Sequence, residues 1–391
     1  MKLPVYLDNS ATTPMDPRVL DVMVPYFLQN FGNSSSRSHV YGWTAEEAVG
    51  LARDQVADLI GADSAEIIFT SGATESINLA IKGIFDQYSF KGNHIITSVS
   101  EHRAVLDCCE WIENNGGFVT YLPVNAEGLI DLAQLESAIT DKTILISIMY
   151  ANNETGTIQP VRRISEVGKK HGILFFSDAT QAAGKIPVQV DEDGIDVLSL
   201  SAHKLYGPKG VGALYVRRKN PKVAVSAQIH GGGHEKNMRS GTLNIPGIVG
   251  FGAACELCNH VLETESTELS ILRDNLETEL LKLSGSHING SLKNRLPHIT
   301  NISFDAVNGE QLLLELCKEV AVSRGSACSS VTTKPSHVLT AMGLDDAAAL
   351  CSFRISLGRF TTLSEIESSF KIMTEIIEKH RNASKLAATL K

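Results

Sequence analysis

The sequence lacks an excess of positive charge. Its 391 residues include 35 Lys and Arg against 44 Asp and Glu, which gives a formal net charge of −9. A chain of this balance has no general electrostatic attraction to nucleic acid or to an anionic membrane surface. We therefore expect neither a nucleic acid nor a membrane among its direct partners.

Long apolar runs and a cysteine framework are also missing. Residues 1–4 lead at once into residues 5–7 without a signal-peptide pattern, and no apolar run has the length to span a bilayer. The seven cysteines are an odd number without framework spacing, so no disulfide scaffold is expected. Cys255 and Cys258 form a C-x-x-C within a helical pattern, which favours burial on a helix face over a zinc or redox site. These absences predict a cytoplasmic protein with free thiols.

What the sequence does contain is a regular alternation of apolar runs and helical patterns. Continuously apolar strands separated by helices indicate a mostly parallel sheet with helices on both faces. The predicted strands are residues 66–70, 94–97, 118–122, 143–148, 173–177 and 197–201, and the predicted helices are residues 44–59, capped by Thr44, 74–84, 104–112, 132–139 and 161–171.

The second half of the chain has a different pattern. Long helical patterns follow residues 241–246, and isolated strands are predicted near residues 301–304 and 353–356. A chain of this length exceeds one ordinary core. We therefore predict a large α/β domain over residues 15–262 and a small α+β domain formed by residues 1–14 and 263–391.

Two of the predicted strands end in segments suited to a ligand. Residues 70–76 (TSGATES) join a strand to a helix with small side chains, so the N–H groups and dipole of the helix could hold a phosphate. An ordinary capped helix start has a similar sequence. His102 lies at another strand end, where a lone histidine is more often a structural hydrogen-bonding group than a catalytic one.

Two further strand ends carry charged groups. Asp178 follows a very apolar strand, and a buried carboxylate there needs a partner, for which a cationic ligand is a fair candidate. Lys204 follows Ser201 and His203 after another apolar strand, and a poorly solvated amine can act as a nucleophile. Most single lysines are simply exposed. Taken with the phosphate segment and His102, however, these groups match the needs of pyridoxal phosphate, which requires a Schiff-base lysine and an acid for its ring nitrogen.

A short segment outside the predicted sheet is also of interest. Residues 321–330 (AVSRGSACSS) are small and polar, which is typical of a mobile loop. An exposed Cys328 near Arg324 would form a thiolate more readily than a buried thiol. The alternative is an incidental surface cysteine.

These motifs together resemble the cysteine desulfurases of the NifS/IscS type, in the class V aminotransferase group, and the short cysteine loop is similar to that of the housekeeping branch. The resemblance covers nearly the whole chain and rests on residues 6–9 (YLDN), 70–75 (TSGATE), 101–102 (EH), 152–154 (NNE), 178–181 (DATQ), 201–204 (SAHK), 238–242 (MRSGT), 325–328 (GSAC) and 354–359 (RISLGR). It implies an α/β pyridoxal-phosphate-dependent transferase fold, aspartate-aminotransferase-like and of fold type I. It also implies a homodimer.

The resemblance further implies a role for each matching residue. The catalytic residues would be Lys204, which carries the cofactor and moves the substrate α-proton, His102, which stacks on the ring, and Cys328, which takes the sulfur. The implied cofactor-binding residues are Ala73, Thr74, Asn153, Asp178, Gln181, Ser201, His203, Lys204 and, toward the phosphate of the other subunit, Thr242. Asn153 and Arg354 would bind the substrate. No metal is implied, although Cys328 could transiently contact an iron–sulfur cluster on an acceptor.

The implied reaction converts L-cysteine to L-alanine and leaves a persulfide on Cys328 for acceptor proteins. Arg324 stands where a small residue is expected, and the chain ends at Lys391 without the longer tail that docks an iron–sulfur scaffold. Iron–sulfur cluster assembly, tRNA thiolation and DNA phosphorothioation therefore stay open as routes. The alternative enzymes are a selenocysteine lyase and a related class V transaminase, and the alternative without enzyme activity is a sulfur-protein scaffold without cofactor.

Overall fold

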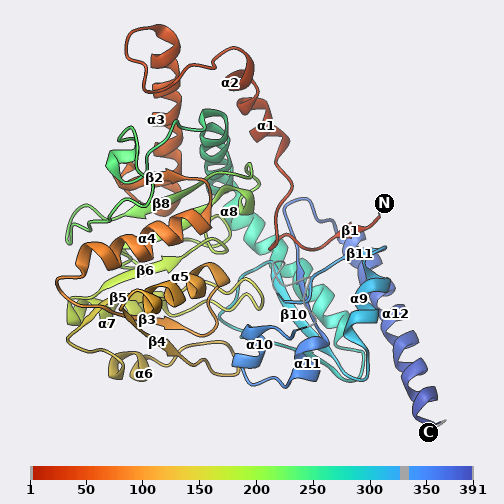
Figure 1. Ribbon diagram of the computed structural model, residues 1–391. Coiled ribbons are helices and arrows are strands. Elements are labelled where there is room, and N and C mark those ends of the chain that lie inside the picture. Colours follow the sequence, from red (N-terminus) through yellow and green to blue (C-terminus); the bar gives the residue numbers. More distant parts are fainter. Residues whose placement is uncertain (1–2, 326–333, 390–391) are drawn as a thin grey trace.

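The large sheet occupies the centre of one half of the molecule (Figure 1). The computed structural model describes residues 3–325 and 334–389, except for the side chains of residues 383–389. Within them the sheet has seven strands in the order β2-β8-β7-β6-β5-β3-β4. Their bounds are β2 (Ile67–Thr70), β3 (His94–Ser98), β4 (Phe118–Leu122), β5 (Thr143–Ser147), β6 (Leu174–Asp178), β7 (Val197–Ser201) and β8 (Gly212–Val216). Six strands lie where the sequence predicts them.

The strand β8 is the one that the sequence analysis missed. It runs antiparallel to both of its neighbours, β2 and β7, whereas β3 to β7 pair in parallel. Gly212 begins it beside the turn that follows β2, and a Cβ there would lie 2.7 Å from the Cα of Gly72. The prediction of a mostly parallel sheet is confirmed, with this one reversed strand.

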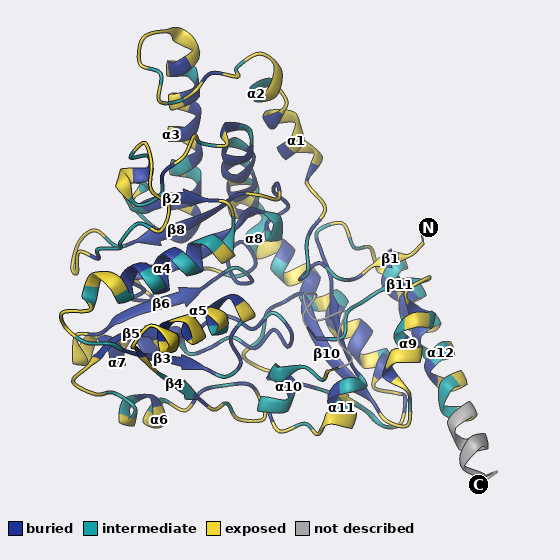
Figure 2. Ribbon diagram, in the orientation of Figure 1, coloured by how far each residue is buried: buried dark blue, intermediate teal, exposed yellow. Residues whose placement is uncertain are grey.

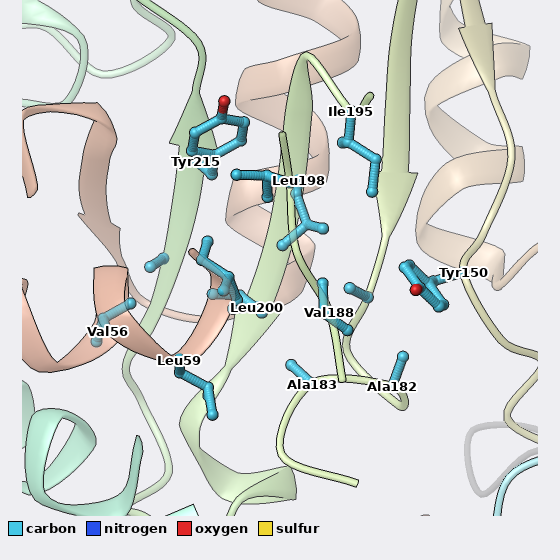
Figure 3. Packing of buried hydrophobic residues seen from close by; sticks show 14 of the residues in the cluster. Val56, Leu59, Tyr150, Ala182, Ala183, Val188, Ile195, Leu198, Leu200 and Tyr215 are labelled. Carbon is cyan, nitrogen blue, oxygen red and sulfur yellow. The ribbon is translucent and has the colours of Figure 1, made fainter. Parts of the chain in front are cut away.

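Helices cover both faces of the large sheet, as the continuously apolar strands require. The helices α4 (Ala73–Tyr88) and α5 (Arg103–Asn114) enclose one core, and α3 (Val40–Ile60) and α7 (Val161–His171) enclose the other. Successive strand residues alternate between these cores, since Ile67 and Phe69 belong to one and Ile68 to the other. Figure 3 shows Leu198 and Leu200 of β7 in the same apolar cluster as Val56 and Leu59 of α3.

Two helices near the sheet differ from expectation in detail. The helix α3 begins at Val40, because the His39 side chain accepts the N–H of Gly42 at 3.2 Å, so the prediction of Thr44 as the capping residue is wrong. The helix α6 (Leu132–Ser137) is six residues long, which is two residues shorter than predicted, and Asp131 caps its start. Short turns complete this half: η1 (Ser64–Glu66), η2 (Ala202–Lys204) and η3 (Glu235–Asn237).

A smaller unit stands beside the large sheet (Figure 1). It contains an antiparallel sheet of β9 (Ser286–Ile288), β10 (Ile299–Phe304) and β12 (Ser352–Ser356), and a parallel pair of β1 (Val5–Tyr6) and β11 (Val320–Ala321). Its helices are α9 (Gly309–Leu316), α10 (His337–Ala341), α11 (Asp346–Leu350) and α12 (Leu363–Thr389). One apolar core joins Leu7, Phe304 and Phe353 to α12.

The long helix α8 (Ile245–Leu280) connects the two halves. By length and composition it alone among the described helices could cross a membrane, which the sequence analysis did not foresee. Half of its most apolar window is buried inside the protein, and it packs against α3 and α12, so it serves as a core helix. Cys255 and Cys258 are both buried on it, as predicted. The division of the chain at residue 262, within this helix, stays a prediction.

Two helices form an arm with the start of α3. They are α1 (Pro17–Met23) and α2 (Pro25–Leu28), and the arm extends away from the sheet at the top of Figure 1. Figure 2 shows that much of the arm is exposed. Its outer side chains include large apolar ones such as Phe27, Phe31 and Trp43, each more than half exposed.

Candidate active site

A cavity of about 460 Å³ lies where the strands of the large sheet end. Parallel strands of an α/β sheet bring their following turns to one edge, which is where ligands bind. Ten of the residues proposed from the sequence line this one cavity: Ala73, Thr74, His102, Asn153, Asp178, Gln181, Ser201, His203, Lys204 and Arg354. The structure therefore brings these ten residues together around one cavity, as the sequence predicts.

The turn after β2 and the start of α4 form a part of the cavity wall that suits an anion. Gly72 precedes α4 as its N-cap residue with a φ of 152°, which side chains rarely adopt, and no side chain caps the helix. The first N–H groups of this long helix, those of Ala73 and Thr74, therefore have no capping side-chain oxygen, and both residues line the cavity. Such an end attracts a phosphate through its N–H groups and its dipole.

Asp178 stands at the end of β6 and is 8% exposed. Its Oδ1 accepts hydrogen bonds from the N–H and hydroxyl of Thr180, at 3.0 and 2.5 Å, and from the hydroxyl of Ser199 at 2.8 Å. Within the described part of the chain, no ion pair is formed by this carboxylate. These neutral donors orient the carboxylate without neutralising it, so a cationic group in the cavity would complete the arrangement.

Lys204 ends the short turn η2 that follows β7, and its amine meets a segment that the sequence analysis did not assign to the site. The Nζ donates to the carbonyl oxygens of Ser10 at 2.5 Å and of Ala11 at 2.6 Å. Thr12, in the same segment, contacts His203 at 3.1 Å. In the sequence, the only sign of this segment's role was a run of polar residues after an apolar pair. A surface turn has the same pattern, so the segment could not be assigned to the site.

The two histidines of the cavity are held in their neutral forms. His102 begins α5, and its Nδ1 accepts the N–H of Ala104 at 3.1 Å, so the proton of the neutral ring is on Nε2. Burial lowers the pKa of His102, and the cation of Lys204 acts in the same direction. Burial, together with Lys204, lowers the pKa of His203 to about 4.

The opposite wall of the cavity is built around Arg354 of β12, which is 1% exposed. Its Nη1 donates to the carbonyl oxygen of Asn153 at 3.1 Å, and its Nη2 donates to Oδ1 of Asp8 at 2.7 Å. Asp8 belonged to a motif recognised in the sequence but was given no role there. We call Asp8, Asn153 and Arg354 the arginine wall. The residues that end β6 or follow β2, β3 and β7 form the strand-end wall: Ala73, Thr74, His102, Asp178 and Lys204.

One described residue of the prediction, Thr242, does not line this cavity, and a second predicted residue falls outside the described part of the chain. Thr242 is exposed, just before α8, and its predicted contact is with another subunit. Cys328 lies outside the described residues, together with the rest of residues 326–333. Among the residues that are described, no group of three His, Cys, Asp or Glu could hold a metal ion.

Comparison with known proteins gives the family. The model of the family described as aminotransferase class-V matches residues 5–368. The cysteine desulfurase IscS of Shewanella denitrificans is 52% identical over 388 residues, which cover 99% of this chain and 96% of that protein.

Two solved structures agree with that likeness. A NIFS-like protein superposes with a TM-score of 0.89 at 38% identity, over 96% of this chain and 100% of its own. SspA, solved in complex with cysteine, superposes with a TM-score of 0.80 at 39% identity, over 92% of this chain and 100% of its own. The chain belongs to the aminotransferase class-V family, in its cysteine desulfurase branch.

Proposed function

We propose that this protein removes sulfur from L-cysteine, releases L-alanine and keeps the sulfur as a persulfide on Cys328. The observation that carries the proposal is that Lys204, Asp178, an uncapped helix start and Arg354 line the same cavity. The relatives named as cysteine desulfurases, and SspA with its bound cysteine, support the same substrate.

Pyridoxal phosphate is the proposed cofactor, and the residues present fit it. The uncapped start of α4, with Ala73, Thr74, Ser201 and His203, would hold the phosphate, because N–H groups and hydroxyls converge there without a competing cap. Asp178 has no cationic partner among the described residues and would pair with the protonated ring nitrogen. When bound, this cofactor supplies an electron sink for a substrate carbanion.

The remaining wall residues complete the cofactor pocket. Lys204 would attach to the aldehyde, and its amine lies beside the carbonyl oxygens of Ser10 and Ala11. The Nε2 of Gln181 donates to the carbonyl oxygen of Ser10 at 3.0 Å, so the second N–H of this amide would donate to the ring oxygen. Asn153 would contact the cofactor, and His102 would stack on its ring.

The protein's own groups then divide the reaction. Arg354 would bind the substrate carboxylate through its fork of N–H groups. The Lys204 amine would take the α-proton, and His102, neutral with its proton on Nε2, would donate to a developing negative charge. The Cys328 thiolate would form an S–S bond to the substrate sulfur as the Cβ–S bond breaks. The electron pair of that bond stays on the carbon, which takes a proton to become the methyl group of alanine.

One experiment separates this proposal from a lyase or a transaminase of the same fold. We expect Cys328→Ser to bind the cofactor normally and to form no persulfide, with alanine production reduced by at least about a hundred-fold. A selenocysteine lyase or transaminase would keep its turnover in this variant. Undiminished alanine formation by Cys328→Ser would therefore remove the proposed role of the thiol.

We also propose that the protein is a homodimer. Supporting this, the arm carries a group of exposed large apolar side chains, which monomeric proteins rarely gather: Leu20, Val22, Val24, Phe27, Leu28, Phe31, Val40, Tyr41 and Trp43. Thr242 would reach the phosphate of the other subunit. We expect the wild type to have the mass of a dimer in light scattering and the double variant Phe27→Glu/Phe31→Glu to have the mass of a monomer. A monomeric wild type would contradict the proposal.

The persulfide would be delivered in the cytoplasm to sulfur-acceptor proteins, for iron–sulfur cluster assembly, tRNA thiolation or DNA phosphorothioation. Capture of acceptors that take radiolabelled sulfur from the wild type and not from Cys328→Ser would identify the route. Failure to label any protein would contradict transfer to acceptors.

A further inference from the structure

Asp8 reaches the arginine wall because the N-terminal segment runs along β12. The N–H of Ser356 donates to the carbonyl oxygen of Leu7 at 2.8 Å, and the N–H of Asn9 donates to that of Ser356 at 3.1 Å. Asp8 thereby pairs with Ser356 as an added parallel bridge. Arg354 lies two residues earlier on the same strand, so the backbone fixes Asp8 beside it.

The Asp8 carboxylate is shared between two partners. Its Oδ1 accepts Nη2 of Arg354 at 2.7 Å, and its Oδ2 accepts the hydroxyl of Ser323 at 2.8 Å. Ser323 is itself paired with Arg354 through the backbone, since the N–H of Arg354 donates to the Ser323 carbonyl oxygen at 2.7 Å. Both oxygens of the carboxylate are thus fixed, and so is the plane in which it meets the guanidinium.

Arg354 lines the cavity, and its guanidinium has N–H groups without a partner among the described residues. Of its five N–H groups, one on Nη1 goes to Asn153 and one on Nη2 goes to Asp8. The Nε is fully buried and has no hydrogen-bond partner among the described residues. A buried guanidinium with free N–H groups at a cavity wall suits a carboxylate ligand, provided that its rotation is held.

We propose that Asp8 is the positioning residue of substrate binding: it holds Arg354 so that the remaining N–H groups of the guanidinium meet the α-carboxylate of the amino-acid substrate. This inference rests on the proposed function. Asp8 acts through Arg354 and does not touch the substrate. It also neutralises a cation that would otherwise be buried alone, which keeps Arg354 in the cavity in the absence of substrate.

The first test compares the kinetic constants of the holoenzyme and Asp8→Asn. An Asn side chain has one acceptor oxygen in place of two and no charge, so it cannot hold both Arg354 and Ser323. We expect the KM for L-cysteine to rise roughly ten-fold, the size of one lost charge-assisted hydrogen bond, with kcat changed by less than about two-fold. A lower KM would mean that Asp8 competes with the substrate, and an unchanged KM that it does nothing for binding. Either outcome overturns the inference.

The second test removes a purely structural explanation. L-alanine has a carboxylate and ethylamine does not, and binding of each to the holoenzyme can be followed by the change in visible absorbance. Asp8→Asn should weaken L-alanine roughly ten-fold and leave ethylamine unchanged. General damage to the site would weaken both equally, which would contradict the proposal. Asp274→Asn is the matched control. It removes a carboxylate on α8 that is also paired with arginine, and it should change the binding of neither L-alanine nor ethylamine.

A third variant keeps the inference testable if Asp8→Asn does not fold. Ser323→Ala removes only the second contact of the carboxylate, so we expect a rise in KM of about two- to three-fold; no rise would overturn the inference. Failure of the proposed function is distinguishable, because wild-type enzyme would then release no alanine from L-cysteine. If the wild type were active and the Asp8→Asn variant had the same KM for L-cysteine, only the role of Asp8 would be refuted.

Discussion

The strand-end wall and the arginine wall of the cavity are supplied by the chain in different ways. Each residue of the strand-end wall ends a strand or follows the end of a strand by at most four residues, so the sheet delivers them all to one edge. The arginine wall joins Arg354 to Asp8 across 346 residues of sequence and to Asn153 across 201. One wall is therefore a property of local segments, and the other exists only when segments far apart in the sequence pack together.

The largest effect is expected on the strand-end wall. Lys204→Ala should lower turnover of L-cysteine by on the order of 10³-fold or more, because it removes both the attachment point of the cofactor and the base. Activity assays and the absorbance of the bound cofactor measure this. Lys219→Ala, which changes a lysine that is 82% exposed, is the control and should retain full activity. Retention of activity by Lys204→Ala would remove the chemical basis of this wall.

The next effect concerns the arginine wall and should appear in a different constant. Arg354→Lys keeps the charge but loses the fork, so kcat/KM for L-cysteine should fall about 100-fold, chiefly through KM. Steady-state kinetics checks the split. A fall in kcat with an unchanged KM would contradict the division that the construction of the two walls suggests, in which one wall serves chemistry and the other serves binding. Arg162→Lys, at a side chain 60% exposed, serves as the control.

A smaller effect is expected where β8 supports the strand-end wall. A Cβ on Gly212 would lie 2.5 Å from the Leu200 carbonyl oxygen and 2.7 Å from the Cα of Gly72, so the backbone must move. Gly212→Ala should destabilise the protein by about 1–3 kcal/mol and weaken cofactor retention. Gly50→Ala, which meets nothing within 4 Å, should be neutral or slightly stabilising. Denaturant midpoints for the two variants measure the difference, and equal midpoints would contradict the close approach.

The smallest effect is a proton linkage at His203. Its pKa is lowered to about 4 in the folded chain, so between pH 6.5 and 4 the unfolded chain binds the extra proton. The stability that His203 contributes is thus fully present above pH 6.5 and is lost as the pH falls toward 4. Because the ring is partly exposed, we expect a loss of about 1 kcal/mol. Unfolding of cofactor-free wild type and His203→Gln across this range checks it, since the variant should lack this part of the slope.

The comparison of the walls also explains which features the sequence could predict. Asp178 and Lys204 were recognisable because an apolar run followed by a polar residue marks a buried strand and its end. The segment Ser10–Thr12 and the pairing of Asp8 were not, since nothing near them in sequence indicates what they contact. Likewise β8 was missed because Gly207, Pro208 and Gly210 precede it, and these residues are typical of a loop.

The sequence by itself determined the alternation of strands and helices, the residues after each strand and the family motifs, because periodicity, turn residues and motif spacing are local properties. Only the tertiary structure decided that α8 is a core helix and not a membrane span, that β8 runs in reverse, and that Asp8 holds Arg354. These depend on burial and on hydrogen bonds between segments far apart in the chain. Their energies are fixed by contacts between those distant segments and leave no pattern in any one stretch of sequence.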